Sequence, residues 1–241
     1  MEIDELERTI RKEESISLSE AFPALMRKVY LWMTLALAIS GVTAYGVANS
    51  PALLQAIYSN SLVFFGIIIA ELVMVWKIAG SVWKENRSLT TTTLMFVIFS
   101  ALNGATLAYI FAMFSTTAIV KTFLVSTTTF AATAAFGYFT RRDLTKLGGI
   151  LLMALIGLII AGLVNMFIAS STMDLMVSAL GVLIFVGLTA WDSQRIKVQL
   201  AMAPDLSESS QKIALAGALS LYLDFINLFL YLLRFFGNSD N

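Results

Sequence analysis

The chain has 241 residues, of which 58% are hydrophobic and only 13% are charged, and its formal net charge is zero. Soluble domains average about 25% charged residues, so a large soluble fold is excluded, and the balanced charge gives no footprint for nucleic-acid binding. The chain has no cysteine and no histidine, which excludes disulfides, thiolate or histidine metal sites, Ser-His triads and histidine proton relays.

The chain begins with a polar stretch, MEIDELERTIRKEESISLSE, in which acidic and basic residues are mixed. A secretory signal peptide needs a basic start followed by a short apolar core, and this stretch has no such core. We therefore interpret residues 1–26 as a cytosolic tail. A membrane domain is expected over residues 27–237, with a short C-terminal tail over residues 238–241.

Seven apolar segments follow, each close to the roughly 20 residues that a helix needs to cross a bilayer. None has the alternating pattern of a membrane-barrel strand. We therefore predict an all-α polytopic membrane protein with seven transmembrane helices and a loop from about Asp192 to Lys212. The predicted spans are Val29–Ala48, Ser61–Ala79, Leu89–Phe114, Ala118–Phe139, Leu147–Ala169, Leu175–Trp191 and Ile213–Phe236.

The basic residues predict the orientation of these spans, because cytoplasmic loops carry an excess of Lys and Arg. With the N-terminus inside, all 16 basic residues except Lys121 and Arg234 fall on the cytoplasmic side. This places the C-terminus outside. A bacterial inner membrane is the expected location.

Three acidic residues lie in or at the end of predicted spans: Glu71, Asp192 and Asp224. An ionisable group in a bilayer is costly, so it usually faces a partner or a cavity and marks a functional site. Asp192 and Asp224 each end or interrupt a stripe of mostly small and polar residues at helical spacing. The sixth-span stripe is Ser178, Gly181, Phe185, Thr189 and Asp192, and the seventh-span stripe is Gly217, Ser220, Asp224, Asn227 and Tyr231.

The two stripes can pack face to face and bring Asp192 towards Asp224. Asp192 ends its predicted span, whereas Asp224 lies about 16 Å into the last one, so the sixth helix must shift or tilt for the acids to meet. Two carboxylates in a dry site then titrate as a coupled pair. A shared proton holds the helices together at low pH, and repulsion separates them at higher pH. Calcium, which prefers oxygen ligands, can relieve that repulsion, with oxygens added by Asn227 and Ser220; the same chemistry suits a proton-coupled carrier.

At these residues the sequence resembles the transmembrane Bax inhibitor motif family. The matching stretches are AWDSQRIK, residues 190–197, and ALSLYLDFINLFLYLLRFFG, residues 218–237. The resemblance implies seven helices with the last one central and wrapped by the other six. It also implies a pH-sensitive calcium leak controlled by Asp192 and Asp224, which would also be the calcium ligands, and no other cofactor.

Relatives in this family have a membrane glutamate in the second helix, which corresponds here to Glu71, and a basic residue further along that helix that pairs with the aspartates. An ungapped alignment from Glu71 places Val82 at that position. Lys77, Lys84 and Arg87 are therefore the candidates for the basic partner.

Three functions are left open by the sequence. The first is the calcium leak, and the second is an interaction protein without flux that modulates a membrane protease or a cell-death or stress pathway. The third is a proton-coupled transporter of another solute. An enzyme is not expected, because the chain has neither histidine nor a metal-ligand cluster and Asp224 lacks the glycine that normally precedes the second acid of an intramembrane aspartyl protease.

Overall fold

The computed structural model describes the backbone of residues 2–83, 87–203 and 205–237, and the side chains of residues 21–82, 87–203 and 205–236. Within these ranges every regular element is a helix. Seven of the helical segments are long and apolar enough to cross a membrane. The predicted all-α fold with seven spans is therefore confirmed.

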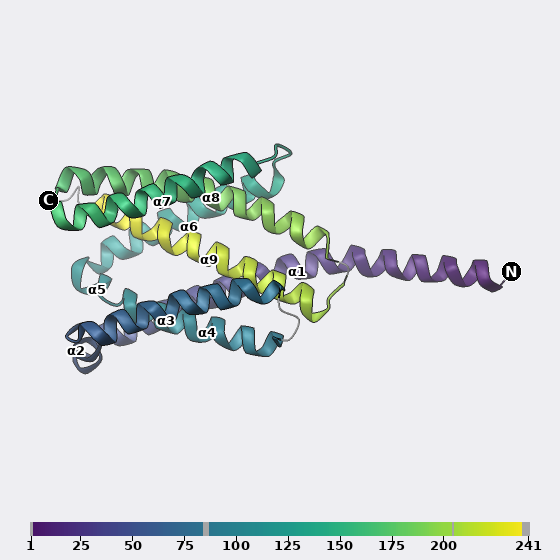
Figure 1. Cartoon of the computed structure of the whole chain (residues 1–241), viewed down its shortest axis with the longest axis horizontal. Helices are drawn as coiled ribbons and strands as arrows, with labels where there is room; N and C mark the ends of the chain where they lie inside the picture. The colour runs from purple at the N-terminus through teal and green to yellow at the C-terminus, as the bar shows by residue number, and fades with distance from the viewer. Residues whose placement is uncertain (1, 84–86, 204, 238–241) are drawn as a thin grey trace.

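The helices are consecutive and joined by short connections (Figure 1). Their bounds are α1 (Glu2–Ala48), α2 (Pro51–Tyr58), α3 (Ser61–Ala79), the 3-10 helix η1 (Gly80–Trp83), α4 (Leu89–Leu107), α5 (Ile110–Met113), α6 (Thr116–Phe139), α7 (Thr145–Ile168), α8 (Ser171–Ala201) and α9 (Glu208–Gly237). Short polar side chains begin several of them by accepting a hydrogen bond from a free backbone N–H of the first turn. These N-caps are Ser50, Asn60, Ser88, Ser115 and Ser170.

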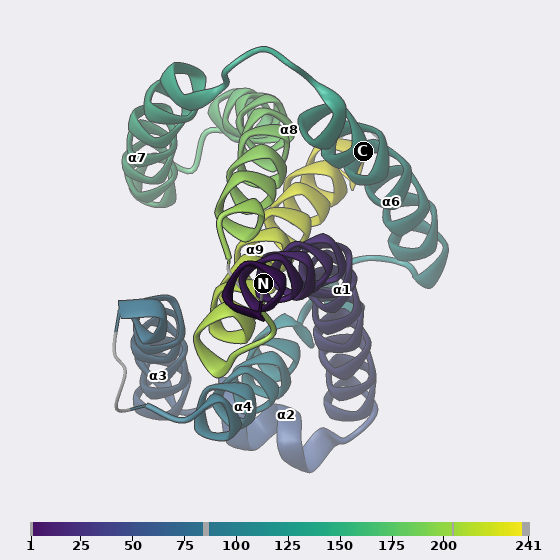
Figure 2. The ribbon, with the colours of Figure 1, turned by 90° about the vertical axis from the view of Figure 1, so that its right-hand side faces the viewer.

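Helix α9 is the most buried of the seven spans. It packs against α1, α3, α4, α6 and α8, while α7 packs on the outside of α8. Figure 2 shows α9 between one group of helices, α1 to α4, and another, α6 to α8. This position explains why α9 combines a long apolar sequence with a polar stripe, since it contacts protein on several of its faces.

The predicted spans agree with the structure to different degrees. Helix α3 has the bounds predicted for the second span. The third predicted span is divided, because α4 ends at Leu107 and α5 begins at Ile110. Helix α2 was not predicted, although Pro51 at its first position and the Ser50 cap are ordinary signals for a helix start.

The predicted end of the sixth span at Trp191 is wrong, because α8 continues to Ala201. The connection between α8 and α9 is therefore shorter than the loop predicted from Asp192 to Lys212, because α8 ends at Ala201 and α9 begins at Glu208. The extra turns persist because Ser193, Ile196 and Leu200 remain buried, which stabilises a helix through packing despite the polar residues between them.

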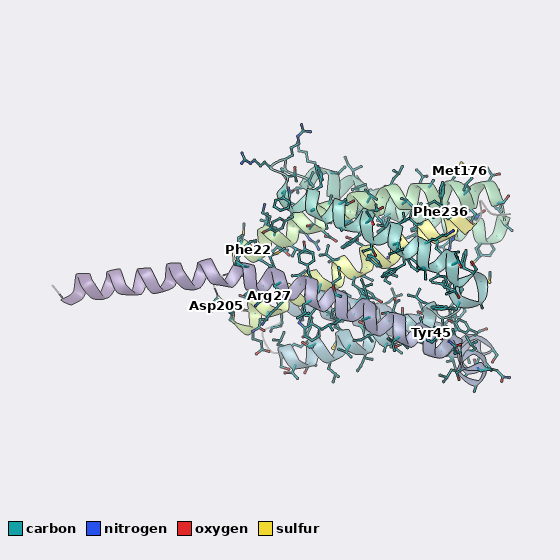
Figure 3. The ribbon with its side chains drawn as sticks, turned by 180° about the vertical axis from the view of Figure 1, so that it is seen from behind. Phe22, Arg27, Tyr45, Met176, Asp205 and Phe236 are labelled. Atoms are coloured by element: carbon teal, nitrogen blue, oxygen red, sulfur yellow. The ribbon has the colours of Figure 1, made fainter. Side chains whose placement is uncertain are left out.

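The start of the α1 span and the α8–α9 connection lie at the same end of the bundle. Lys28 on α1 donates a 2.6 Å hydrogen bond to Gln211 on α9, and Lys212 donates to the carbonyl of Arg87 at 2.9 Å. Figure 3 shows Arg27 and Asp205 at this end, and Tyr45 at the other. Helix α1 runs through residue 26, where the tail was predicted to end; that division of the chain stays a prediction, and residues 238–241 lie outside the described part.

Candidate functional site

The polar stripes of α8 and α9 face each other, as the sequence predicts. The Phe185 and Tyr231 rings stack with their centroids 5.8 Å apart, and the backbone of Gly181 lies against the same Tyr231 ring. Further along the interface, the carboxyl groups of Asp192 and Asp224 line the same cavity and are close enough to interact electrostatically. All members of the α8 stripe are buried.

The longer α8 explains how two aspartates at unequal predicted depths can meet. Asp192 lies nine residues before the end of α8 at Ala201, which corresponds to roughly 14 Å along the helix axis. Asp224 lies sixteen residues after the start of α9 at Glu208. Both acids are therefore well inside their helices.

The two aspartates line a cavity of about 310 Å³ between α7, α8 and α9. Asp192 is 7% exposed and Asp224 is 5% exposed, so both carboxyl groups are largely shielded from the surroundings. Ser220 and Asn227, the predicted supporting residues, line the same cavity. Arg195 also lines the cavity, and the remaining lining is apolar: Leu152, Leu155, Phe185, Leu188, Trp191 and Leu223.

The basic partner of the pair is Arg195, one helical turn beyond Asp192 on α8. Its Nη2 atom lies 3.0 Å from Asp192 Oδ1 and donates a 3.2 Å hydrogen bond to the Ser220 hydroxyl on α9. The guanidinium carbon also lies 4.7 Å from the centre of the Trp191 ring. Arg195 thus contacts both helices and is oriented by an aromatic face.

A glycine on α7 makes room for this arrangement. The backbone of Gly148 lies so close to the Trp191 ring that a Cβ atom at this position would overlap the indole. The absence of a side chain therefore allows α7 to hold the ring on which Arg195 stacks. Helix α7 contributes to the site through this contact and through Leu152 and Leu155 in the cavity wall.

Several buried polar atoms at this interface lack a hydrogen-bond partner in the described structure. They are Ser178 Oγ, Asp192 Oδ1, Arg195 Nε and Asp224 Oδ2. Asp192 Oδ1 has the ion pair with Arg195, but the N–H groups are not aligned with it for a hydrogen bond. Buried polar groups are normally satisfied, so these carboxylate oxygens have the capacity to accept a hydrogen bond or to contact a cation at the cavity.

Lys77, Lys84 and Arg87 were predicted as candidates for the basic partner of the aspartate pair. The structure does not place Lys77 or Arg87 at the cavity. Lys77 is exposed. Arg87 instead donates to the backbone carbonyl of Lys77. Lys84 lies outside the described residues. In the sequence, Arg195 contributed only to the predicted orientation of the membrane spans. Its spacing of three residues from Asp192 is nevertheless the usual spacing of a helical ion pair.

Glu71 belongs to a different polar network, on α3, α4 and α9. Its carboxylate accepts hydrogen bonds from Asn103 at 3.1 Å and Thr106 at 3.0 Å. The Asn103 oxygen accepts a 2.8 Å hydrogen bond from the Tyr222 hydroxyl, which is 2.7 Å from the Ser40 hydroxyl on α1. Glu71 does not line the cavity of the aspartate pair.

Tyr58, on the short helix α2 outside the spans, closes this network at one end. Its hydroxyl donates to the carbonyl of Ala105 at 2.8 Å and accepts from the backbone N–H of Tyr109 at 3.1 Å. Burial raises the pKa of the Tyr58 hydroxyl, which therefore stays protonated and serves as a fixed hydrogen-bond donor.

The donor set of the aspartate pair suits a hard cation only in part. Two carboxylates, a hydroxyl and an amide are the oxygen ligands that calcium prefers. Across the described residues, however, no cluster of three or more acidic side chains could form a closed metal site.

Comparisons with known proteins show the family to which the chain is similar. A family model described as inhibitor of apoptosis-promoting Bax1 matches residues 23–241. The inner membrane protein YbhL of Escherichia coli strain K12 is 39% identical over 235 residues, which cover 97% of this chain and 99% of that protein. A protein of Borreliella burgdorferi described as uncharacterized is 42% identical over 231 residues, covering 96% and 97% of the two chains.

Proposed function

Because this chain belongs to the Bax inhibitor family of membrane proteins, we propose that it is a pH-sensitive calcium leak channel gated by Asp192 and Asp224. The single observation that carries this proposal is that two largely buried carboxyl groups, from α8 and α9, line one cavity between α7, α8 and α9. The protein contacts the bilayer along seven spans. Calcium ions and protons are its proposed partners, and transport rather than catalysis is its proposed role.

The charge balance of the cavity explains why a proton would act as the gate. Its charged lining residues are Asp192, Asp224 and Arg195. With both acids ionised the group carries one net negative charge, and with one shared proton it is neutral. Since an uncompensated charge is costly away from water, the neutral, singly protonated state favours the closed contact between the helices.

In the proposed protonated state two interactions hold α8 against α9, and an ion pair within α8 supports them. The shared proton joins Asp192 to Asp224, the ion pair positions Arg195, and Arg195 binds Ser220 across the interface. Loss of the proton replaces the first of these with repulsion between two carboxylates. We expect the helices to separate at this point and the cavity to become continuous with the aqueous phases.

Calcium then takes the place of the lost proton. A divalent cation compensates the ionised pair, and Ser220 and Asn227 offer further oxygens at the same cavity. Conduction needs binding that is strong enough for entry and weak enough for release. Two carboxylates beside a competing guanidinium would hold calcium less tightly than a closed set of oxygen ligands, and this favours release of the ion.

We propose that this protein lies in a bacterial inner membrane, because the similar protein YbhL is named an inner membrane protein. The distribution of Lys and Arg supports an N-terminus in the cytoplasm and a C-terminus outside. With this orientation the aspartate pair is closer to the cytoplasmic end of α8 than to its outer end, so cytoplasmic pH would set its protonation.

The test is calcium flux into liposomes that contain the purified protein and a calcium dye. We expect flux to rise as pH rises through the transition of the pair. Asp192→Asn and Asp224→Asn each remove the repulsion, so both variants should keep the low flux of acidic pH at every pH. Asp174→Asn is the matched control, because Asp174 is also on α8 but pairs with Arg234 at the other end, 3.6 Å away.

The same experiment separates the other candidate functions. No flux at any pH in well-formed proteoliposomes would overturn the channel proposal and favour a modulator of another membrane protein. Saturable flux that requires a proton gradient would favour a proton-coupled transporter. If both Asp→Asn variants had the pH profile of the wild type, the aspartate pair would not control the flux.

A further inference from the structure

A second and larger cavity, of about 960 Å³, lies on the side of the bundle between α1 and α6. Both helices pack on α9, and Figure 2 shows them on the same side of it. The floor of this groove is formed by buried residues from all three helices: Met33, Phe130, Ala134 and Phe225. We refer to it as the α1–α6 groove.

The walls of the α1–α6 groove are exposed at the level of the membrane spans. Val42 is 74% exposed, and Thr34 and Ala131 are also exposed. The two threonines of the lining present little polarity, because Thr34 donates to the carbonyl of Tyr30 and Thr127 donates to the carbonyl of Phe123, each at 2.8 Å. The groove is therefore apolar and open towards the hydrocarbon of the bilayer.

One end of the groove is cationic and aromatic. Arg27 lines it together with Tyr30 and Tyr138, and the Arg27 side chain has no hydrogen bond or ion pair with the described part of the chain. Lys197 lies next to this end, with Nζ 5.1 Å from the centre of the Tyr138 ring and bonded to the Tyr138 carbonyl at 2.7 Å. Figure 3 shows Arg27 where α1 enters the bundle.

We propose that the α1–α6 groove binds an anionic phospholipid of the leaflet at this end, with one acyl chain in the groove and the phosphate at Arg27. The distance along α1 from Arg27 to Val42 is about 22 Å, which exceeds the roughly 15 Å depth of one leaflet. An acyl chain therefore fits within the groove. A guanidinium matches the geometry of a phosphate, and tyrosines are typical of the level of the headgroups.

The volume and the lining also fit a specific site better than ordinary contact with lipid. Ligand sites of about 300–1,000 Å³ with an apolar lining and a few polar groups at one position are typical of small-molecule binding. Here Arg27 and the two tyrosines are gathered at one end of the groove, while its remaining length is apolar and includes Phe123, Phe130 and Phe225. This asymmetry matches a phospholipid, which has one charged end and a long apolar chain.

The proposal is tested with the full chain in nanodiscs that contain phosphatidylglycerol with a photoactivatable group in one acyl chain. Mass spectrometry of the cross-linked peptides should place the label on residues 26–42 of α1 and 123–139 of α6. Unlabelled phosphatidylglycerol should compete, and phosphatidylcholine should compete about fivefold less well, as expected for one basic residue at the membrane surface.

Two pairs of variants make this test specific. Ala131→Trp fills the groove and should remove most of the label, whereas Ala132→Trp, at the neighbouring exposed residue outside the lining, should not. Arg27→Gln should abolish the preference for the anionic lipid, and Arg141→Gln, at an exposed position outside the groove, should preserve it. If a helix shift masks the effect of Ala131→Trp, Ala38→Trp fills the groove from the opposite wall.

Three outcomes would overturn the proposal. Equal labelling of the wild type, Ala131→Trp and Ala38→Trp would mean that the lipid contact is not specific to the groove. Equal competition by phosphatidylcholine would remove the role of Arg27. Cross-links between two protein chains through α1 and α6, lost together with a dimer in Ala131→Trp, would identify a second copy as the occupant.

Discussion

The guanidinium of Arg195 on α8 donates a 3.2 Å hydrogen bond to the hydroxyl of Ser220 on α9. The same guanidinium forms the ion pair with Asp192. One side chain therefore both balances the charge of the aspartate pair and joins the two helices. These two roles can be separated by experiment, because Ser220 contributes only to the second.

Arg195→Gln should move the pH dependence of calcium flux to higher pH. A nearby positive charge favours the ionised form of a carboxyl group, so its loss lets the pair keep its proton at higher pH, by about 1–2 pH units. Ser220→Ala should leave the midpoint nearly unchanged, because it removes a hydrogen bond and no charge. Flux titrations of both variants check this, and a midpoint of Arg195→Gln that is unchanged or lower would contradict the charge balance.

Gly148→Ala and Gly149→Ala should have opposite effects on stability. A Cβ atom at Gly148 overlaps the Trp191 ring, whereas a Cβ atom at Gly149 meets no other atom within 4 Å. Overpacking typically lowers the free energy of unfolding by about 1–3 kcal/mol, while replacing an unrestricted helical glycine raises it by about 0.5–1 kcal/mol. Denaturant unfolding in detergent measures both, and equal effects would show that Gly148 is not required for the close approach of α7.

Tyr222→Phe should destabilise the bundle without changing its shape. The hydroxyl of Tyr222 is bonded to Asn103 and Ser40, and its removal leaves buried partners unsatisfied, at about 1–2 kcal/mol. The control is Tyr109→Phe, since Tyr109 is 40% exposed. A thermal melt in which both variants match the wild type would mean that the network contributes no stability.

Glu71→Gln should leave the pH midpoint of calcium flux unchanged. Glu71 is held by Asn103 and Thr106 and lies outside the cavity of the aspartate pair. We expect a loss of about 1 kcal/mol in stability from the weakened hydrogen bonds and no shift in gating. A clear shift of the midpoint, or the loss of pH dependence expected for Asp224→Asn, would place Glu71 in the pH sensor and refute this separation.

Helical periodicity predicted which faces of α8 and α9 pack together, whereas the resemblance to a known family supplied Asp192 as the partner of Asp224. Gly181 and Tyr231 pack together as the two stripes require, and Asp192 meets Asp224. The pattern works here because one narrow polar face on an otherwise apolar membrane helix can be satisfied only inside the bundle. The direction of the stripe therefore follows from physical chemistry.

The role of Arg195 and the length of α8 were harder to predict. Hydropathy falls at Asp192, Ser193, Gln194 and Arg195, which is the usual sign that a span ends. The helix continues because tertiary packing buries every third or fourth residue, and packing overrides local polarity. The division between α4 and α5 at Ala108 and Tyr109 has no proline or glycine to signal it.

The most direct test of the gate is an infrared titration of protonated carboxyl groups, carried out on the proteoliposomes used for calcium flux. We expect a protonated-carboxyl band that disappears over the pH interval in which flux rises. The band should be absent near neutral pH in Asp192→Asn and Asp224→Asn, because a single carboxylate is already balanced by Arg195, and should persist in Asp174→Asn. A band that does not titrate in that interval, or that survives in both variants, would contradict a gate based on a proton shared by Asp192 and Asp224.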